Sequence, residues 1–176
     1  MERKIYLAGG CFWGVEAYFK NIKGVVKTSV GYANGISDSA VYKELSKTLH
    51  AETVEVVFDP EIVGLSFLLD MYFQIIDPTS INKQGGDIGT QYRTGIYYCD
   101  ESDVSIIQDA LAELRTHFEL PLAIEVEPLR HYCHAEDMHQ DYLTINPTGY
   151  CHIRPSMISD AKSAVPIPEP AWRLEK

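Results

Sequence analysis

Hydrophobic spacing in the first part of the chain predicts a strand, a helix and a second strand. Residues 3–8 form a short apolar run that stops at two glycines, a pattern typical of a buried strand. Between residues 12 and 22 apolar side chains recur at every third or fourth position, which predicts an amphipathic helix that Gly24 ends. Residues 25–32 then predict a second strand.

The same patterns continue through the middle of the chain. Residues 53–59 alternate, with Val54, Val56 and Phe58 on one face, and therefore predict a third strand. The further predicted elements are a helix over 66–76 with Ser66 as its N-cap, a strand over 94–99, a helix over 100–118 with Asp100 as its N-cap and Phe118 on its apolar face, and a strand over 122–128.

This order, β-α-β-β-α-β and then α-β, predicts the fold class α+β. Its first six elements match a ferredoxin-like unit, so we expect a two-layer sandwich with helices on one face of one sheet. The polar segments 33–51 and 77–93 are expected to be loops, and a loop as long as the second is often functional. We expect residues 1–150 to form a single domain and residues 151–176 an irregular C-terminal tail packing on it.

Composition narrows the class of protein. The chain has 176 residues, 45% hydrophobic and 23% charged, as expected of one ordinary globular domain. Its formal net charge of -10 argues against nucleic acid and anionic membranes as partners, because both attract positive surfaces. The N-terminal segment lacks the apolar stretch of a signal peptide, and no run of about 18 apolar residues follows. We therefore expect a cytoplasmic protein whose cysteines stay reduced.

The four cysteines are then core thiols, metal ligands or redox groups. No Cys-x-x-Cys pair occurs, and His134 and His139 are five residues apart, about 140° around a helix, so we expect no metal and no other cofactor. Cys99 ends an apolar strand and is expected to be a core thiol. Cys151, in a proline-flanked segment, suits a resolving thiol that attacks an oxidised partner, whereas Cys133 is undecided.

Cys11 lies where the first predicted strand turns into the first helix. A cysteine at a helix N-terminus has a lowered pKa and forms the nucleophilic thiolate more readily, and the glycines at 9 and 10 permit a turn that exposes the sulfur. A buried, inert cysteine is an equal alternative, because burial acts on the pKa in the opposite direction. Phe12 and Trp13 project about 100° apart on a helix, so one of them is free to line a pocket.

Glu52 and Asp87 are the acidic candidates. Glu52 directly precedes the third strand, where it is a solvated strand end or, within an aromatic pocket, a proton donor with a raised pKa. Asp87 and Tyr92 lie in a glycine-rich segment that lacks the Gly-Lys-Ser/Thr of a phosphate loop. A turn residue explains Asp87 equally well at this point.

Five motifs together resemble the peptide methionine sulfoxide reductases of the A type. They are "GCFWG", "HAE", "GDIGTQYR", "AEDMHQDYL" and "NPTGYC", in that order, and the resemblance extends from about residue 4 to residue 151. It implies that residues 1–150 are a catalytic domain that reduces methionine-S-sulfoxide, free or in proteins, to methionine. The family works through a cysteine sulfenic acid and an intramolecular disulfide, and its usual reductant is thioredoxin.

The resemblance also implies the catalytic roles. Cys11 would be the nucleophile that attacks the sulfoxide sulfur, and Cys151 would be the resolving cysteine. Glu52, together with Tyr42 and Tyr92, would hydrogen-bond the sulfoxide oxygen and supply its proton.

The binding roles are implied in the same way. Phe12 and Trp13 would form the apolar wall that receives the ε-methyl group, and Asp87 would hydrogen-bond the substrate backbone. The chain departs from the family where "SAVY" replaces the common "NPTY" before the first tyrosine, and where Met138 replaces an aromatic residue. No cysteine follows Cys151, so we expect a single resolving thiol, with Cys133 as a backup.

Two other classes of function stay open on the sequence. A peroxide sensor or peroxidase would use the same Cys11 and Cys151 pair, and it would turn over peroxide but neither epimer of methionine sulfoxide. A zinc-stabilised binding module would contain metal.

Overall fold

The structure, a computed structural model, describes residues 1–175 and centres on a six-stranded sheet in the order β7-β6-β1-β3-β2-β8. Neighbouring strands are antiparallel except β6 and β7, which are parallel. A small antiparallel hairpin is separate from this sheet. Its two strands, β4 (Lys83–Gln84) and β5 (Asp87–Ile88), are two residues long each. The strands of the sheet are β1 (Arg3–Gly9), β2 (Val25–Ala33), β3 (Ala51–Phe58), β6 (Thr94–Tyr98), β7 (Glu125–Pro128) and β8 (Cys133–His134).

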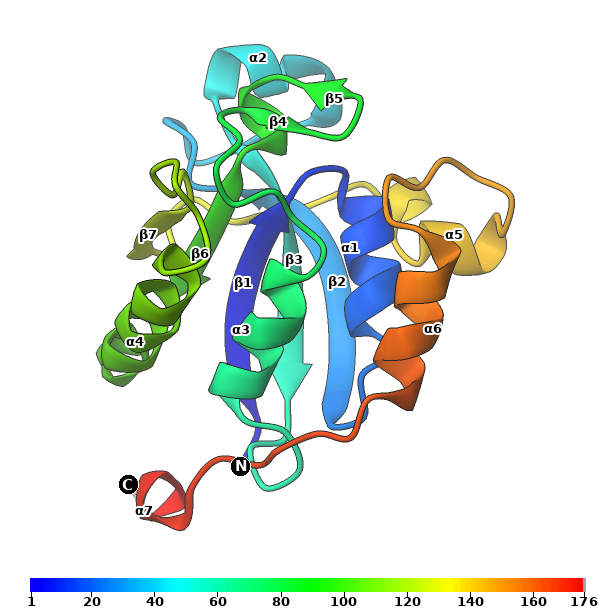
Figure 1. Ribbon diagram of the computed structural model, residues 1–176. Coiled ribbons are helices and arrows are strands. Elements are labelled where there is room, and N and C mark those ends of the chain that lie inside the picture. The colour runs from blue at the N-terminus through cyan, green and yellow to red at the C-terminus, as the bar shows by residue number, and fades with distance from the viewer. Residues whose placement is uncertain (176) are drawn as a thin grey trace.

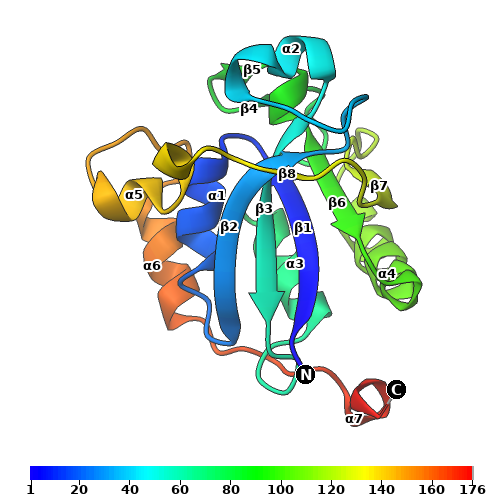
Figure 2. The ribbon, with the colours of Figure 1, turned by 180° about the vertical axis from the view of Figure 1, so that it is seen from behind.

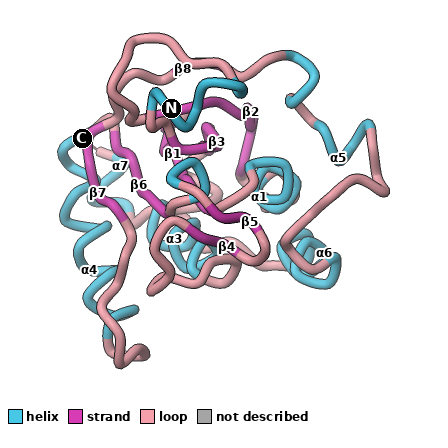
Figure 3. Tube along the Cα trace, turned by 90° about the horizontal axis from the view of Figure 1, so that it is seen from above, coloured by secondary structure: helices cyan, strands magenta, loops and turns pink. Residues whose placement is uncertain are grey.

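The helices α1, α3 and α6 lie on the same side of the sheet (Figures 1 and 3). The longer helices are α1 (Phe12–Phe19), α3 (Leu65–Phe73), α4 (Val104–Arg115) and α6 (Pro155–Ser163). The short ones are α2 (Leu45–Thr48), α5 (Tyr142–Ile145) and α7 (Ala171–Leu174). Single 3-10 turns are formed by Tyr42–Glu44, Thr90–Tyr92, Glu101–Asp103 and Asp137–His139.

The ferredoxin-like prediction is confirmed. Strands β1, β2, β3 and β6, with α1 and α3 between them, stand in the spatial order β6-β1-β3-β2. The additional α4 leads to β7, which extends one edge of the sheet in parallel with β6, and β8 pairs with β2 at the other edge. The predicted loops 33–51 and 77–93 contain short turns and the small hairpin.

Strand alternation decides which side chains reach the core. On β1, Ile5 and Leu7 face the helices, and on β3 Val54 and Val56 do the same, all of them 0% exposed. Burying a side chain of this size stabilises the fold by about 1.5–3 kcal/mol. Because side chains alternate along a strand, Glu52, two residues before Val54, also points to the helix side. The strand period therefore places an acidic group inside the apolar layer.

The prediction that Ser66 caps the second long helix is wrong. Helix α3 begins at Leu65 with Gly64 as its N-cap, and Gly64 has no side chain to accept a hydrogen bond. The Leu65 N–H is instead satisfied by a carboxylate oxygen of Glu169, at 2.7 Å, from a segment far along the chain. Tertiary contact thus replaces the local cap that the sequence suggested.

Two further expectations, about Phe118 and Cys99, fail at the ends of elements. Helix α4 ends at Arg115, so Phe118 lies outside it and is 39% exposed, shortly before Pro121, which cannot continue a helix. Cys99 is exposed and not a core thiol, because β6 stops at Tyr98.

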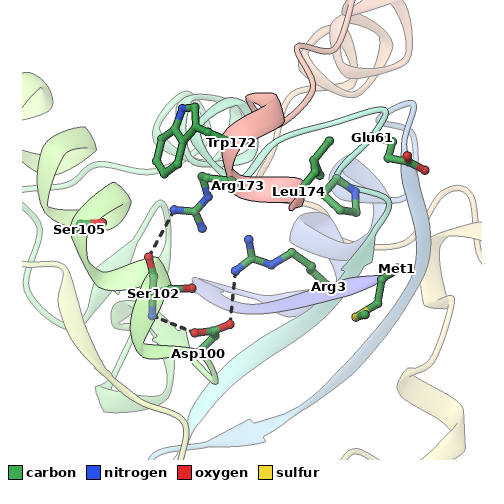
Figure 4. Close-up of a pocket in the computed structure, with 10 residues that line it drawn as sticks. Met1, Arg3, Glu61, Asp100, Ser102, Ser105, Trp172, Arg173 and Leu174 are labelled. Carbon is green, nitrogen blue, oxygen red and sulfur yellow. Dashed lines mark hydrogen bonds and ion pairs between the residues drawn. The ribbon is translucent and has the colours of Figure 1, made fainter. Parts of the chain in front are cut away.

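The expected irregular C-terminal tail is wrong for Pro155–Ser163, which forms α6 beside α1. Proline fits in the first turn of a helix because its missing N–H would have no partner there. Beyond α6 the chain returns to the end of the sheet that carries both termini. There Arg173 donates to the Ser102 carbonyl (Figure 4). Arg173 also pairs with Asp103 at 3.1 Å. These contacts fasten the tail to the rest of the chain.

The opposite face of the sheet is crossed by the segment that carries β8 (Figure 2). A small second cluster lies on this face, where the Tyr6 and Tyr132 rings meet edge to face at 4.9 Å beside the buried Tyr97. None of the helices within residues 1–175 combines the length and apolar character that a membrane crossing requires.

Candidate active site

Cys11 lies at the junction of β1 and α1, at the top of the sheet in Figure 1. Gly10 turns the chain there with φ of +89°, a conformation that favours glycine, and Cys11 is the N-cap of α1. Cys11 is only 7% exposed. Burial, and then the neighbouring Glu52, raise the pKa of its thiol to about 12, although the Trp13 backbone N–H opposes this. Burial therefore outweighs the helix start, and the resting Cys11 is a protonated thiol at neutral pH.

Glu52 reaches the same place from β3. It is 2% exposed, and its Oε1 accepts the backbone N–H of Phe12, the residue after Cys11, at 3.3 Å. Its Oε2 accepts the side-chain amide of Gln91 at 3.1 Å. Burial raises the pKa of Glu52 to about 7, even though both hydrogen bonds lower it. Glu52 can therefore hold or release a proton near neutral pH beside the Cys11 thiol.

Tyr92 lies near this carboxyl group, and Tyr42 lies beside Tyr92. Burial, then Glu52 and the Tyr42 hydroxyl, raise the pKa of Tyr92, so its hydroxyl remains a hydrogen-bond donor at any physiological pH. Tyr42 is 45% exposed and so stands toward solvent. The structure thus places Tyr92 near Glu52 and Tyr42 beside Tyr92.

Arg93 fixes the loops that carry these groups. Its Nη1 donates to the carbonyl oxygens of Leu49 and Thr90, both at 2.9 Å, and its Nη2 donates to the Asn34 carbonyl at 3.0 Å. Its Nε pairs with Glu125 of β7 at 3.0 Å. One guanidinium therefore ties the loop after β2, the start of β3 and the turn of Tyr92 into one arrangement.

Phe12 and Trp13 differ in burial, as predicted for neighbours on a helix. Phe12 is 1% exposed, whereas Trp13 is half-buried and stacks on Tyr142 with ring centroids 3.7 Å apart. The Trp13 indole N–H donates to Nδ1 of His139 at 3.2 Å. Trp13 is therefore held in a fixed orientation by contacts to its ring face and to its N–H.

Glu136 and His139 continue this network. The His139 Nε2 lies 3.2 Å from a carboxylate oxygen of Glu136, which also accepts the Tyr32 hydroxyl at 2.8 Å. The second Glu136 oxygen accepts the Tyr42 backbone N–H at 3.2 Å. Burial works to raise the pKa of Glu136, but the hydrogen bonds from Tyr32 and the Tyr42 N–H bring it below its ordinary value. Glu136 thus links the aromatic wall to Tyr42.

Sequence reasoning did not assign Gln91, Tyr32, Glu136, His139 or Tyr142 to the site. Three of them lie within "AEDMHQDYL" and Gln91 within "GTQYR", motifs already quoted for the resemblance. Their membership in these motifs was therefore the signal that could have assigned these four residues to the site. Tyr32 carried none, because a tyrosine on a buried strand is ordinarily a core residue.

Asp87 lies on β5, in the hairpin that Figure 1 shows beyond the end of the sheet where β1 leads into α1. Its Oδ2 accepts the Tyr150 hydroxyl at 2.8 Å. Burial is the main cause of the raised pKa of Cys11 and of Glu52, and Asp87 raises both further by a smaller amount. A predicted substrate contact is thus placed at the same site.

Cys151 lies against the first turn of α1. A Cβ added to Gly14 would be 3.0 Å from its sulfur, so glycine at this position leaves the space that the sulfur occupies. Gly14 is three residues beyond Cys11, and Cys151 also raises the pKa of the Cys11 thiol, as a minor influence. The two cysteines therefore approach each other at the start of one helix, both as free thiols.

Other conspicuous features lie outside this site. A surface pocket of about 590 Å³ is lined by Arg3, Asp100 and Trp172 at the end of the molecule with both termini, and it contains no predicted site residue (Figure 4). The Cys133 sulfur contacts the Asp38 carbonyl at 3.3 Å. Within residues 1–175 no three His, Cys, Asp or Glu side chains are grouped to hold a metal ion.

Taken together, a buried thiol, a carboxyl group that titrates near neutrality and a second thiol define a site for thiol-based oxidation and reduction. Residues 3–168 match the family described as peptide methionine sulfoxide reductase. The chain belongs to this family.

Individual proteins agree with this assignment. The chain is 53% identical over 166 residues to peptide methionine sulfoxide reductase MsrA of Lachnoclostridium phytofermentans, covering 93% of this chain and 100% of that protein. Among solved structures it resembles Mxr1 from Saccharomyces cerevisiae in reduced form, with a TM-score of 0.82 and 35% identity over 87% of this chain and 91% of that one. Mxr1 in complex with Trx2 gives a TM-score of 0.58 and 25% identity over 80% and 84%.

Proposed function

We propose that this chain reduces methionine-S-sulfoxide, free or within proteins, to methionine, and so repairs proteins after oxidative damage. The observation that carries the proposal is the buried pair of Cys11 and Glu52. Glu52 accepts the N–H of the residue after Cys11 and has a pKa raised to about 7. A sulfoxide oxygen leaves readily only when it is protonated, so the reaction needs an acid opposite a sulfur nucleophile. The pair supplies both.

In the first step the Cys11 sulfur attacks the sulfoxide sulfur while Glu52 protonates the oxygen. The proton of the Cys11 thiol passes to the Glu52 carboxylate, which restores the acid. The bond formed between the two sulfurs then breaks as the protonated oxygen passes to the Cys11 sulfur. Methionine is released, reduced by two electrons, and Cys11 becomes a sulfenic acid, oxidised by two electrons. Tyr92 and Tyr42 would hydrogen-bond the oxygen as it gains charge.

Substrate binding follows from the residues around the pair. The buried Phe12 and the fixed Trp13 form an apolar wall suited to the methyl group of methionine sulfoxide. Asp87, on the hairpin above, accepts a hydrogen bond from Tyr150 and would accept a backbone N–H of a peptide substrate. Together the wall and the acceptor would orient the sulfoxide at Cys11, and this orientation would select one epimer at sulfur.

In the second step the Cys151 sulfur attacks Cys11, the S–O bond breaks, and a disulfide and water form. Cys151 is supported in this role by its place against Gly14, in the first turn of α1. It also lines a surface pocket of about 610 Å³ between α1 and α6, through which a reductant can reach the disulfide.

Thioredoxin is the proposed reductant. The support is the likeness to Mxr1, a protein solved in complex with Trx2. A dithiol partner of this kind returns both cysteines to thiols and is itself oxidised to a disulfide. The cycle suits the cytoplasm, where such reductants keep cysteines reduced.

The decisive experiment uses the Cys151→Ser variant and each epimer of methionine sulfoxide. We expect about one methionine per enzyme from the S epimer, none from the R epimer, and no further turnover with thioredoxin. Cys11→Ser should form no methionine. Cys99→Ser is the matched control, because Cys99 is exposed and outside the site, and it should turn over as the native chain does.

Two results would contradict this proposal. Consumption of peroxide without consumption of either epimer would favour the peroxidase. Full thioredoxin-coupled turnover by Cys151→Ser would transfer the resolving role to Cys133 or to direct reduction of the sulfenic acid.

A further inference from the structure

His152, the residue after Cys151, fits into a notch on the start of α1. Its Nε2 lies 3.0 Å from the Gly9 carbonyl oxygen. A Cβ added to Gly10 would be 3.0 Å from the His152 Nε2, and one added to Gly14 would be 3.4 Å from its Nδ1. The imidazole therefore occupies space that two glycines on either side of Cys11 leave open.

The hydrogen bond to Gly9 fixes the tautomer of His152. A carbonyl oxygen only accepts, so Nε2 carries the hydrogen and Nδ1 keeps a free lone pair. This Nδ1 is buried and finds no hydrogen-bond partner within residues 1–175. Burial lowers the pKa of His152, although the Gly9 carbonyl and Asp87 oppose this, so the ring is a neutral base at neutral pH. The first and second steps as described above leave this base unused.

The Cys151 sulfur and the His152 Nδ1 both lie beside Gly14, and in the resting structure the thiol donates to the Ile153 carbonyl at 3.2 Å. The same position on Gly14, that of an added Cβ, lies 3.0 Å from the Cys151 sulfur and 3.4 Å from Nδ1. Burial raises the pKa of the Cys151 thiol, with the Ile153 backbone opposing, so this thiol is protonated at rest. Only a thiolate attacks efficiently, and Cys151 therefore requires a base close to its sulfur.

We propose that Nδ1 of His152 accepts the proton of the Cys151 thiol as that sulfur attacks the sulfenic acid of Cys11. The S–S bond forms, the S–O bond breaks, and the departing hydroxide takes the proton from the imidazolium to give water. Cys151 is oxidised, Cys11 is reduced, and His152 ends neutral, so the step balances without any other reactant. This role rests on the proposed function, because it concerns the second step of that cycle.

The test separates the two steps in the His152→Gln variant. Glutamine can still donate to the Gly9 carbonyl but carries no base in the place of Nδ1. With one equivalent of methionine-S-sulfoxide, methionine should form at the native rate and amplitude, whereas disulfide formation, followed as loss of thiols, should slow about 100-fold or more. His117→Gln, on an exposed histidine after α4, should leave both steps unchanged.

The pH dependence of the disulfide step distinguishes a His152 that accepts a proton from one that only holds Cys151 in position. Asp87 of β5 is the charged group that acts on the pKa of His152, and the Cys151 thiol lies beside the same Gly14 position as the imidazole. Glu52, Cys11 and Tyr150 interact in turn with Asp87. In His152→Gln the disulfide step should recover as the pH rises and Cys151 ionises unaided. In the native chain, which needs no variant to fold, the same step should slow as the pH falls through a value below that of an ordinary histidine.

Three outcomes would overturn the role of His152. The first is an unchanged rate of disulfide formation in His152→Gln, and the second is a slow disulfide step in this variant that high pH does not restore. The third is a rate of disulfide formation in the native chain that does not fall as the pH is lowered. If the native chain releases no methionine at all, the proposed function itself fails, and the two failures are thus distinguishable.

Discussion

Two carboxylates in this molecule cap helices from distant parts of the chain. Glu52 and Glu169 are 2% and 4% exposed. Glu52 accepts the N–H of Phe12 at the start of α1, and Glu169 accepts the N–H of Leu65 at the start of α3. Neither helix is capped by the side chain of its own N-cap residue. The local geometry of the two sites is therefore the same.

The second partner of each carboxylate differs. Glu169 lies 3.2 Å from the Arg173 guanidinium, whereas the other oxygen of Glu52 meets the neutral amide of Gln91. Within residues 1–175 no cation pairs with Glu52. A buried carboxylate beside a guanidinium keeps its charge, but one held by neutral donors gains a proton more readily. The same kind of helix cap thus serves two purposes. Glu169 fastens the C-terminal tail at one end of the sheet, and Glu52 can hold a proton beside Cys11 at the other end.

The largest effect is expected from removing the proton at the Cys11 end. Glu52→Ala should slow methionine formation in a single turnover about 100- to 10,000-fold, because proton transfer to the leaving oxygen is lost. Glu52→Gln should retain more activity, since the amide still hydrogen-bonds the oxygen. Glu169→Gln, the matched change at the other end, should react at the native rate. A native rate in Glu52→Ala would place the proton donor elsewhere.

The next effect is on the pH dependence of stability. Burial raises the pKa of Glu52 from 4.5 to about 7 in the folded chain, so its contribution to stability is complete below 4.5 and is lost as the pH rises through 7. Glu52→Gln removes this loss. Its free energy of unfolding, relative to the native chain, should rise by about 3 kcal/mol between pH 4.5 and 8.

Urea denaturation of both proteins across this range measures the difference. A difference between Glu52→Gln and the native chain that is constant with pH would contradict the raised pKa.

The smallest effect concerns the cap of α3. Glu169→Ala should lower the free energy of unfolding by about 2 kcal/mol, because a helix cap is lost and the buried Arg173 loses a partner. Ser66→Ala, at the exposed residue that the sequence suggested as the cap, should stay within about 0.5 kcal/mol of the native chain. Thermal or urea unfolding measures the two losses of stability. A larger loss in Ser66→Ala than in Glu169→Ala would show that Ser66 is the cap of α3.

Much of the fold could be predicted because periodicity and burial agree in the central sheet. Alternation over residues 53–59 predicted β3, and the helical spacing after Cys11 predicted α1. Two of the errors, the N-cap of α3 and the helix in the C-terminal tail, occur where a distant segment decides the local structure. Glu169 caps α3 in place of Ser66, and packing on α1 makes Pro155–Ser163 helical in a stretch without clear periodicity.

The candidate site was predictable to the extent that its residues belong to recognisable motifs. The structure brings Cys11, Glu52 and Cys151 together, and their chemical roles stay proposals. The state of the Cys11 thiol was not predictable, because a helix start and burial shift its pKa in opposite directions and only coordinates show which is larger. The environment of His152 was equally inaccessible, since it depends on two glycines more than a hundred residues away.

The contact between Glu169 and Leu65 also has a consequence for biosynthesis. Its two partners are separated by 104 positions, so while the ribosome extends the chain, α3 must wait with its first N–H groups uncapped until the later segment emerges. The central β1 waits in the same way for its second neighbour, β6. The nascent chain therefore completes these long-range contacts, and the cooperative fold that depends on them, late in translation. A stall before residue 169 would leave α3 frayed at its start.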